Sequence, residues 1–205
     1  MMSTGTSAAG ASAPRPKRPA YTLESLLDVA VTVFNERGYD GTSMEDLARA
    51  AGITKSSIYH HVKGKEELLE RGVNRALDAL NASLDSVDGA GSALEQVEQA
   101  VFRAVGVLVA ELPYVTLLLR VRGNTEGERR TVTRRRDIDR RLADLVGKAV
   151  EEGGLRADLD PHLASRLVFG MVNSVSEWYR TGYGESADAV ASAVMHLVFD
   201  GLRER

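Results

Sequence analysis

The sequence has no cysteine and few aromatic residues, and each shortage excludes a class of protein. Without cysteine there can be no disulfide framework, thiolate zinc site, iron–sulfur cluster or cysteine nucleophile. Aromatic residues are 5% of the 205 residues, and the abundant alanine, leucine, glutamate and arginine favour helices. No apolar run reaches the ~18–20 residues of a membrane helix, and the N-terminus lacks a secretory apolar segment. We therefore expect an all-α, cytoplasmic protein of one or two domains.

The net charge of −3 hides two local basic patches. Residues 49–65 hold four lysines and arginines and no acid, and residues 120–141 hold nine arginines against four acids. Residues 1–19 are rich in Ser, Thr, Ala, Gly and Pro with a basic end, which predicts a disordered tail that either is passive or touches DNA. Local fields steer association with anions more than net charge does, so both patches are candidate anion sites.

Helical periodicity runs through the rest of the chain and predicts nine helices. Four lie in residues 21–85: one capped by Thr22 and stopped at Gly38, residues 44–51, a short helix from Thr54 to about residue 61, and residues 65–84. The other five are expected at residues 92–111, 113–122, 126–152, 160–180 and 186–202. We expect domain boundaries at residues 1–19 (tail), 20–80 and 81–205.

Residues 43–61 have the pattern of a helix-turn-helix, in which the second helix lies in the major groove of DNA. Two short helices flank a tight turn at Gly52, and Ile53 and Ile58 are apolar and seat the second helix. Its remaining side chains are small, polar or basic and point outward. Helix N-termini and lysines suit phosphate, and Lys55 can also reach a guanine edge. The predicted DNA-contacting residues are Thr42, Ser43, Thr54, Lys55, Ser56, Ser57, Tyr59, His60, Lys63 and Lys65.

Some of these residues also have a plain structural explanation. Tyr59 can be partly packing, His60 and His61 can be solvated residues at a helix end, and Lys65 can simply begin the fourth helix. A sigma factor or a recombinase could share the geometry, but a partner domain of five helices would be unusual there.

Residues 42–68, TSMEDLARAAGITKSSIYHHVKGKEEL, resemble the N-terminal domain of TetR-family transcriptional regulators. The one departure is Val62, where the family usually has Phe, so we expect slightly looser packing. The resemblance implies an all-helical homodimer that binds a palindromic operator and pairs its last two helices with their copies as a four-helix bundle. The matching positions are Thr42, Leu47–Ala48, Ala51–Gly52–Ile53–Thr54, Ile58–Tyr59, His61 and Lys65–Leu68.

The second basic patch places arginine where helical spacing predicts a core residue. The apolar stripe through Ile138, Leu142 and Leu145, extended back by one turn, arrives at Arg134 and Arg135. Arginine binds phosphate through its bidentate fork, so arginines beside an apolar cavity indicate a ligand with an apolar end and a phosphorylated end. The alternative is a solvated helix with i,i+4 pairs Glu126–Arg130 and Asp137–Arg141.

Residues 114–130 and 169–183 resemble the acyl-CoA-responsive branch of the family, nearest to phenylacetyl-CoA-responsive regulators and close to steroid-ring CoA regulators. The resemblance implies an acyl group among apolar residues and CoA phosphates near the arginines. The predicted ligand-binding residues are Phe102, Leu118, Arg120, Arg122, Arg134, Arg135, Phe169, Val172 and Trp178.

We expect a dimeric repressor that a small-molecule effector, such as phenylacetyl-CoA, releases from its operator. Three alternatives remain: a TetR-like repressor that senses a lipophilic drug or another non-CoA metabolite, a ligand-free structural DNA binder, and an enzyme acting on CoA esters. The enzyme is disfavoured because the chain has no HExxH, GxSxG or P-loop motif and no cysteine. We expect no metal, no cofactor and no membrane partner.

Overall fold

The computed structural model describes residues 21–87, 89, 91–180 and 182–202, and this part of the chain is all-α. The predicted tail of residues 1–19 lies outside the described residues. The described residues form nine helices, as the periodicity predicts: α1 (Leu23–Arg37), α2 (Met44–Ala51), α3 (Lys55–Tyr59), α4 (Lys65–Asp85), α5 (Ala93–Ala110), α6 (Leu112–Arg120), α7 (Glu126–Glu151), α8 (Pro161–Trp178) and α9 (Ala187–Leu202).

Local capping chemistry fixes the ends of the first two helices. The hydroxyl of Thr22 accepts a hydrogen bond from the Ser25 N–H, and the hydroxyl of Ser43 accepts one from the Asp46 N–H. Each is half of a capping box that satisfies amide groups left free at a helix start. Gly52 follows α2 with φ +67°, a left-handed conformation that side chains other than glycine's rarely adopt. The predicted caps Thr22 and Ser43 and the stop at Gly52 are confirmed.

Several predicted helix boundaries are shifted by one or two residues. The short helix that begins after Thr54 ends at Tyr59, because the N–H groups of both His61 and Val62 turn back to the carbonyl of Ile58. The next two histidines therefore lie in a turn. Helix α6 begins at Leu112, so Pro113 occupies its second position, where the missing N–H is still not needed.

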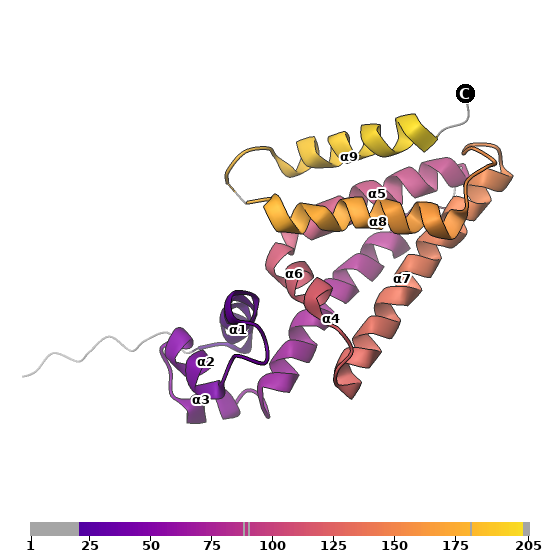
Figure 1. Ribbon diagram of the computed structural model, residues 1–205. Helices are drawn as coiled ribbons and strands as arrows, with labels where there is room; N and C mark the ends of the chain where they lie inside the picture. The colour runs from indigo at the N-terminus through magenta and orange to yellow at the C-terminus, as the bar shows by residue number, and fades with distance from the viewer. Residues whose placement is uncertain (1–20, 88, 90, 181, 203–205) are drawn as a thin grey trace, which may run out of the picture.

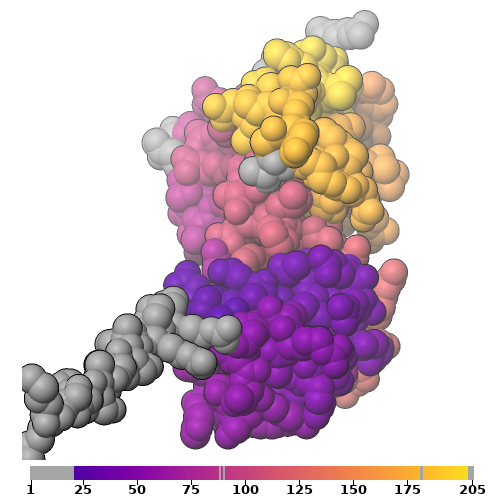
Figure 2. All heavy atoms as spheres, turned by 90° about the vertical axis from the view of Figure 1, so that its left-hand side faces the viewer, coloured from indigo at the N-terminus to yellow at the C-terminus, as the bar shows by residue number. Residues whose placement is uncertain are grey.

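The helices form two connected bodies, with α4 running from one into the other (Figure 1). Helices α1, α2 and α3 pack at the lower end, and α8 and α9 lie at the opposite end over α5. Helix α7 runs beside α4 and packs against α5 and α8. The space-filling view shows the N-terminal helices as a lobe of their own below the others (Figure 2). Helix α4 is thus the element that both bodies share.

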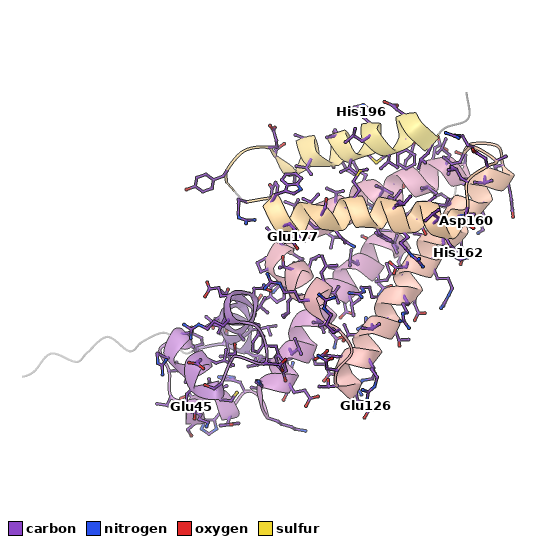
Figure 3. All side chains as sticks on the ribbon, in the orientation of Figure 1. Glu45, Glu126, Asp160, His162, Glu177 and His196 are labelled. Carbon is purple, nitrogen blue, oxygen red and sulfur yellow. The ribbon has the colours of Figure 1, made fainter. Side chains whose placement is uncertain are left out.

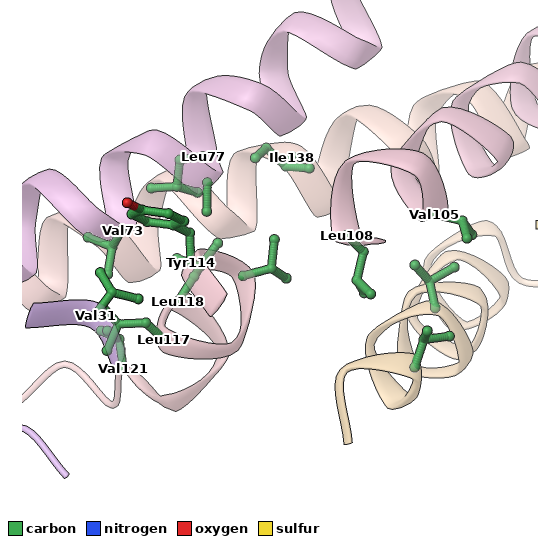
Figure 4. Close-up of a cluster of buried hydrophobic side chains, with 14 of the residues drawn as sticks. Val31, Val73, Leu77, Val105, Leu108, Tyr114, Leu117, Leu118, Val121 and Ile138 are labelled. Carbon is green, nitrogen blue, oxygen red and sulfur yellow. The ribbon is translucent and has the colours of Figure 1, made fainter. Parts of the chain in front are cut away.

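The apolar core continues through the junction between the two bodies (Figure 4). Leu77 of α4, Leu118 of α6 and Ile138 of α7 are almost fully buried there, beside Val31 of α1. Burial of this kind contributes roughly 25 cal/mol per Å² of apolar surface. One core therefore joins α1, α4, α6 and α7.

Several large apolar side chains on α8 remain exposed. Leu163 is 55% exposed, Leu167 65% and Trp178 56%, and they follow one another at helical spacing along one side of the helix. The opposite side, with Val168 and Val172, is buried. Exposed apolar side chains that share one side of a helix are typical of surfaces that contact another chain.

No single described helix is both long and apolar enough to cross a membrane. Helices α5 and α6 reach the length and apolar composition of a membrane-spanning segment only when they are taken together, and the chain bends by 100° where they meet.

Candidate DNA-binding and effector sites

Helices α2 and α3 form the helix-turn-helix that the sequence predicts. Ala48 and Ala51 of α2 are buried, so their small side chains allow the two helices to approach closely. Ile58 of α3 is fully buried and Ile53 packs partly against the same core. Val62, at the position where the family usually has Phe, is also buried. This packing leaves the outer side of α3 facing solvent.

The predicted DNA-contacting residues near α3 and at the helix starts differ in what their side chains already bond. Ser56, Tyr59, His60 and Lys63 are exposed around α3, and Lys55 is exposed on its first turn. The hydroxyls of the capping residues are bonded locally: Thr54 bonds Ser57 at 2.8 Å, and Ser43 donates to the Asp46 carboxylate at 2.6 Å. Ser43 and Thr54 are exposed as well, so they also lie on the surface that can meet a groove, although their hydroxyls are used to shape the helix starts.

Lys55 has an acidic partner in the free protein. Its ammonium donates to the carboxylate of Glu45, on the first turn of α2. This hydrogen bond lowers the pKa of Glu45 and raises the pKa of Lys55, so the pair stays charged near neutral pH. Both side chains are well exposed, and a phosphate can compete with Glu45 for the ammonium.

Thr42 and Lys65 point into the protein. The Thr42 side chain is 2% exposed and donates to the carbonyl of Gly38 at 2.7 Å. The Lys65 ammonium donates to the carbonyls of Tyr39 and Thr42 at 3.0 and 3.1 Å, and it lies 4.4 Å from the centre of the Tyr39 ring. Lys65 therefore ties the first residue of α4 to the turn before α2, and DNA contact by either side chain stays a prediction.

A polar cluster joins α4 to both α1 and α6. Arg75 of α4 bonds Glu111 with nitrogen–oxygen distances of 2.7 and 3.2 Å, and its guanidinium lies 4.2 Å from the ring centre of Tyr114. The hydroxyl of buried Tyr114 donates to the carboxylate of Asp28 on α1. Burial, followed by this hydrogen bond to Asp28, strongly raises the pKa of Tyr114. The phenol stays protonated and keeps donating.

A cavity of about 580 Å³ opens between α4, α5, α6, α7 and α8. This volume is within the range of small-molecule sites. Apolar side chains form most of the wall, and arginines of α7 and α8 stand on it with a single carboxylate. The apolar part is Leu80, Ala104, Leu108, Val115, Leu118, Leu119, Ile138, Phe169, Gly170 and Val172, and the polar part is Arg135, Arg136, Asp139, Arg140, His162, Ser165, Arg166 and Asn173.

Four of the predicted ligand-binding residues line this cavity and five lie elsewhere. Leu118, Phe169, Val172 and Arg135 are on its wall, and Arg135 also donates to the Leu118 carbonyl at 3.5 Å. Among the others, Phe102 and Trp178 are exposed, and so is Arg122 on the α6–α7 loop. Arg120 donates a hydrogen bond to the Asn35 carbonyl of α1, and Arg134 donates to side chains of α4. Ligand contact by any of the nine stays a prediction.

The polar residues that the sequence reading missed follow helical spacing around ones that it found. Asp139 lies one turn after Arg135 on α7, and His162, Arg166 and Asn173 follow one another along α8. Figure 3 places His162 at the end of α8 that lies beside α7. Counting forward by four from Arg135 could have found Asp139, but the α8 residues required knowing that α8 packs on α7.

Asp139 is the one carboxylate on the cavity wall. Partial removal from water raises its pKa above the ordinary value, while Arg135 and Arg166 act in the opposite direction. Arg135, Arg136 and Arg166 form no ion pair with any carboxylate among the described residues. The cavity therefore combines an apolar wall with guanidinium groups available to an anion.

The remaining α7 arginines are bonded, and one predicted pair is wrong. Arg130 bonds Glu126 at 3.1 Å, as i,i+4 spacing predicts. Asp137 instead pairs with Arg140 at 2.9 Å, and Arg141 reaches across to Asp85 of α4 at 2.6 Å. The expected Asp137–Arg141 pair fails because Arg141 faces α4. Among the described residues, no group of three or more His, Cys, Asp or Glu is placed to hold a metal ion.

Comparison with known proteins agrees with this architecture. Residues 26–71 match the family model described as bacterial regulatory proteins, tetR family, and residues 90–202 match a tetracyclin repressor-like C-terminal domain. The transcriptional repressor KstR2 from Rhodococcus jostii is 30% identical over 86% of this chain and 89% of its own length.

Two solved structures extend the comparison. SCO3833, a TetR transcriptional regulator family member from Streptomyces coelicolor A3, is 60% identical with a TM-score of 0.83, over 90% of this chain and 94% of that one. AibR, in complex with isovaleryl coenzyme A and operator DNA, is 23% identical with a TM-score of 0.75 over 86% of this chain and 97% of that one, a likeness of fold. The chain belongs to the TetR family of transcriptional regulators, whose members bind operator DNA as dimers, respond to small molecules and are not enzymes.

Proposed function

We propose that this ligand-responsive repressor leaves its operator when an amphipathic anion, an acyl-CoA thioester such as phenylacetyl-CoA, enters the cavity. In this proposal residues 20–80 are the DNA-binding domain and residues 81–205 bind the effector and dimerise. The operator is a palindrome, read by the exposed residues of α3 in each copy. We assign the main DNA contacts to Lys55, Ser56, Tyr59 and His60.

One observation carries the choice of effector: an apolar cavity with guanidinium groups on its wall. An apolar acyl group would be stabilised against Leu118, Phe169 and Val172. Arg135 and Arg166, on two different helices, would hold phosphate or another anionic group through charge-assisted hydrogen bonds. AibR, which shares the fold, was crystallised with isovaleryl coenzyme A, so the fold can accommodate this class of ligand.

Effector binding would act on DNA through α4. Leu80 of α4 lines the cavity, and the start of the same helix is bonded to the turn before α2 by Lys65. An effector that displaces α4 changes the separation of the two recognition helices of a dimer. Because coupling is reciprocal, operator DNA weakens effector binding by the same factor.

The second candidate is a repressor that senses a lipophilic drug or another metabolite without CoA. The apolar wall favours it as much as it favours a thioester. The charge on the wall argues against a cationic drug, because four arginines would oppose a single carboxylate.

The test is release of DNA from the protein by a panel of compounds. A palindromic site, enriched from random DNA by the wild-type protein, is titrated with phenylacetyl-CoA, isovaleryl-CoA, a steroid-derived CoA thioester, free CoA, the free acids and a lipophilic cation. We expect a thioester to release DNA far more effectively than free CoA, which lacks the apolar body, or the acids, which lack the phosphates. Release by the cation alone would support the second candidate.

Arg135→Gln separates effector binding from DNA binding. We expect the active thioester to be needed at about tenfold higher concentration, because one charge-assisted contact is lost. DNA affinity without effector should stay within about twofold. Arg156→Gln, a surface arginine paired with Asp158, is the control and should change neither. An unchanged response of the Arg135 variant would contradict its contact with the effector.

A further inference from the structure

We infer that Arg134 and Arg141 of α7 are positioning residues that fix α4 along α7 and thereby set the separation of the two DNA-binding heads. The inference rests on the proposed function in one respect, that a dimer reads a palindrome with two heads. It assigns to Arg134 a role away from the effector.

The two arginines make the same arrangement of bonds seven residues apart. Arg134 donates to the Asn74 side-chain oxygen and to the Asp78 carboxylate, each at 2.6 Å. Arg141 donates to Asn81 at 3.2 Å and to Asp85 at 2.6 Å. Asparagine and aspartate are four residues apart in both pairs, and both pairs recur after seven residues. We call these six residues the α4–α7 clamp.

The clamp flanks a seam with the spacing of a coiled coil. Each clamp residue of α4 follows, by one position, an apolar residue that faces α7 or the core. These apolar residues are Val73, Leu77, Leu80 and Leu84. On α7, Arg134 and Arg141 each precede a seam residue, Arg135 and Leu142. Alternating spacings of three and four, with charged pairs at the flanks, are how parallel helices set their register.

The order of the contacts shows that the two helices run in the same direction. Glu70, Asp78 and Asp85 rise along α4 and meet Arg130, Arg134 and Arg141 in that order along α7. Figure 1 shows the same arrangement, with both helices leaving the lower end together. A slide of α4 along α7 by less than seven residues would break all of these bonds together.

The clamp lies between the cavity and the DNA-binding helices and has a close connection to each. Arg134 is next to Arg135, which lies on the cavity wall. At its other end, α4 begins at Lys65, which is bonded to the carbonyls of Tyr39 and Thr42 just before α2. The register of α4 on α7 therefore contributes, together with the contacts of α6 with α1 and α4, to where the helix-turn-helix lies relative to the rest of the subunit.

The exposure of the clamp side chains indicates that the clamp affects the position of α4 on α7 more than the stability of the fold. The side chains of Asp78 and Asp85 are 69% and 67% exposed, and those of Arg134 and Arg141 are 39% and 43% exposed. Ion pairs this open to water contribute little to the free energy of folding. Six residues in a repeated arrangement can still disfavour alternative registers, because a shift of less than seven residues leaves all of them unpaired and a shift of seven re-forms only one of the two sets.

The test compares a full palindrome with a single half-site, using the wild-type protein and Arg134→Gln with Arg141→Gln. A dimer gains from binding both halves only if its heads are held at the right separation. We expect the double variant to bind the palindrome about tenfold more weakly and the half-site within about twofold of wild type. Its thermal midpoint should change little, and the experiment needs no effector.

Two further variants sharpen the result. Arg71→Gln removes an ion pair within α4, to Glu67, and should leave both affinities unchanged. Exchanging the partners, Asp78→Arg with Arg134→Asp, should restore much of the palindrome affinity that Arg134→Gln loses. Equal losses on palindrome and half-site, or no loss on either, would overturn the inference. A wild-type protein that binds both DNAs equally would instead contradict the proposed dimeric reading of a palindrome.

Discussion

Lys55 and Lys65 flank the helix-turn-helix and look alike in sequence, but their surroundings differ. Lys55 is exposed and shares its ammonium with Glu45. Lys65 is half-buried and donates to two backbone carbonyls. Sequence reasoning could predict that both lysines lie near DNA, but not that the Lys65 ammonium is already bonded to backbone carbonyls of the protein. The difference arises because the turn at residues 38–42 folds back onto the start of α4, a tertiary contact with no local signal.

Lys55→Ala should weaken binding to the selected palindrome. The substitution removes an ammonium group that can leave Glu45 and bind a DNA phosphate instead. The dependence of log affinity on log salt concentration should become shallower by about one unit. Fluorescence anisotropy at several salt concentrations measures both quantities. Lys148→Ala, which removes an exposed charge from the last turn of α7, is the control and should alter neither. An unchanged slope for Lys55→Ala would exclude a phosphate contact.

At the scale of elements, helix ends were predictable and helix partners were not. Thr22, Ser43 and Gly52 mark helix ends through bonds within a few residues, so the sequence contains the whole cause. Arg134 belongs to the opposite case. Its position in an apolar stripe suggested an anion site, whereas it bonds Asn74 and Asp78 of α4. Only packing decides which of two adjacent arginines faces the cavity.

At Gly72, α4 passes close to α1 and α6. A side-chain carbon added there would lie 3.1 Å from Val31 of α1 and 3.2 Å from Leu117 of α6, both buried. Gly72→Val should lower the free energy of unfolding by about 2 kcal/mol, as expected for overpacking. Chemical denaturation measures this value.

Gly106 is the matched control for that substitution. It also lies within a helix, α5, but nothing lies within 4 Å of an added carbon. Gly106→Ala should therefore raise the free energy of unfolding by about 0.5–1 kcal/mol through the lower entropy of the unfolded chain. If Gly72→Val were as stable as wild type, α1, α4 and α6 would not be as tightly packed as the core indicates.

On the scale of the whole molecule, the sequence predicted two anion sites within an acidic chain, and the structure places their exposed cations at different positions along α4. Lys55 and Lys63 are exposed at the DNA-binding end, while Arg135 and Arg166 line the cavity beyond the middle of that helix. The sequence could not show that several arginines of the second patch bind α4 acids. In the proposed function, the patch therefore contributes both the effector site and a link to the DNA-binding end.

The exposed stripe on α8 predicts how the whole molecule assembles. Leu167, the most exposed residue of that stripe at 65%, lies between Leu163 and Met171 on the same side of the helix. Leu167→Asp places a charge where a partner subunit would bury an apolar side chain, so we expect a monomer. Light scattering after gel filtration gives the mass. The variant should lose the preference for a palindrome over a half-site and keep its half-site affinity. Ala157→Asp, in an exposed loop, should remain dimeric. A dimeric Leu167 variant that still prefers the palindrome would place the interface elsewhere.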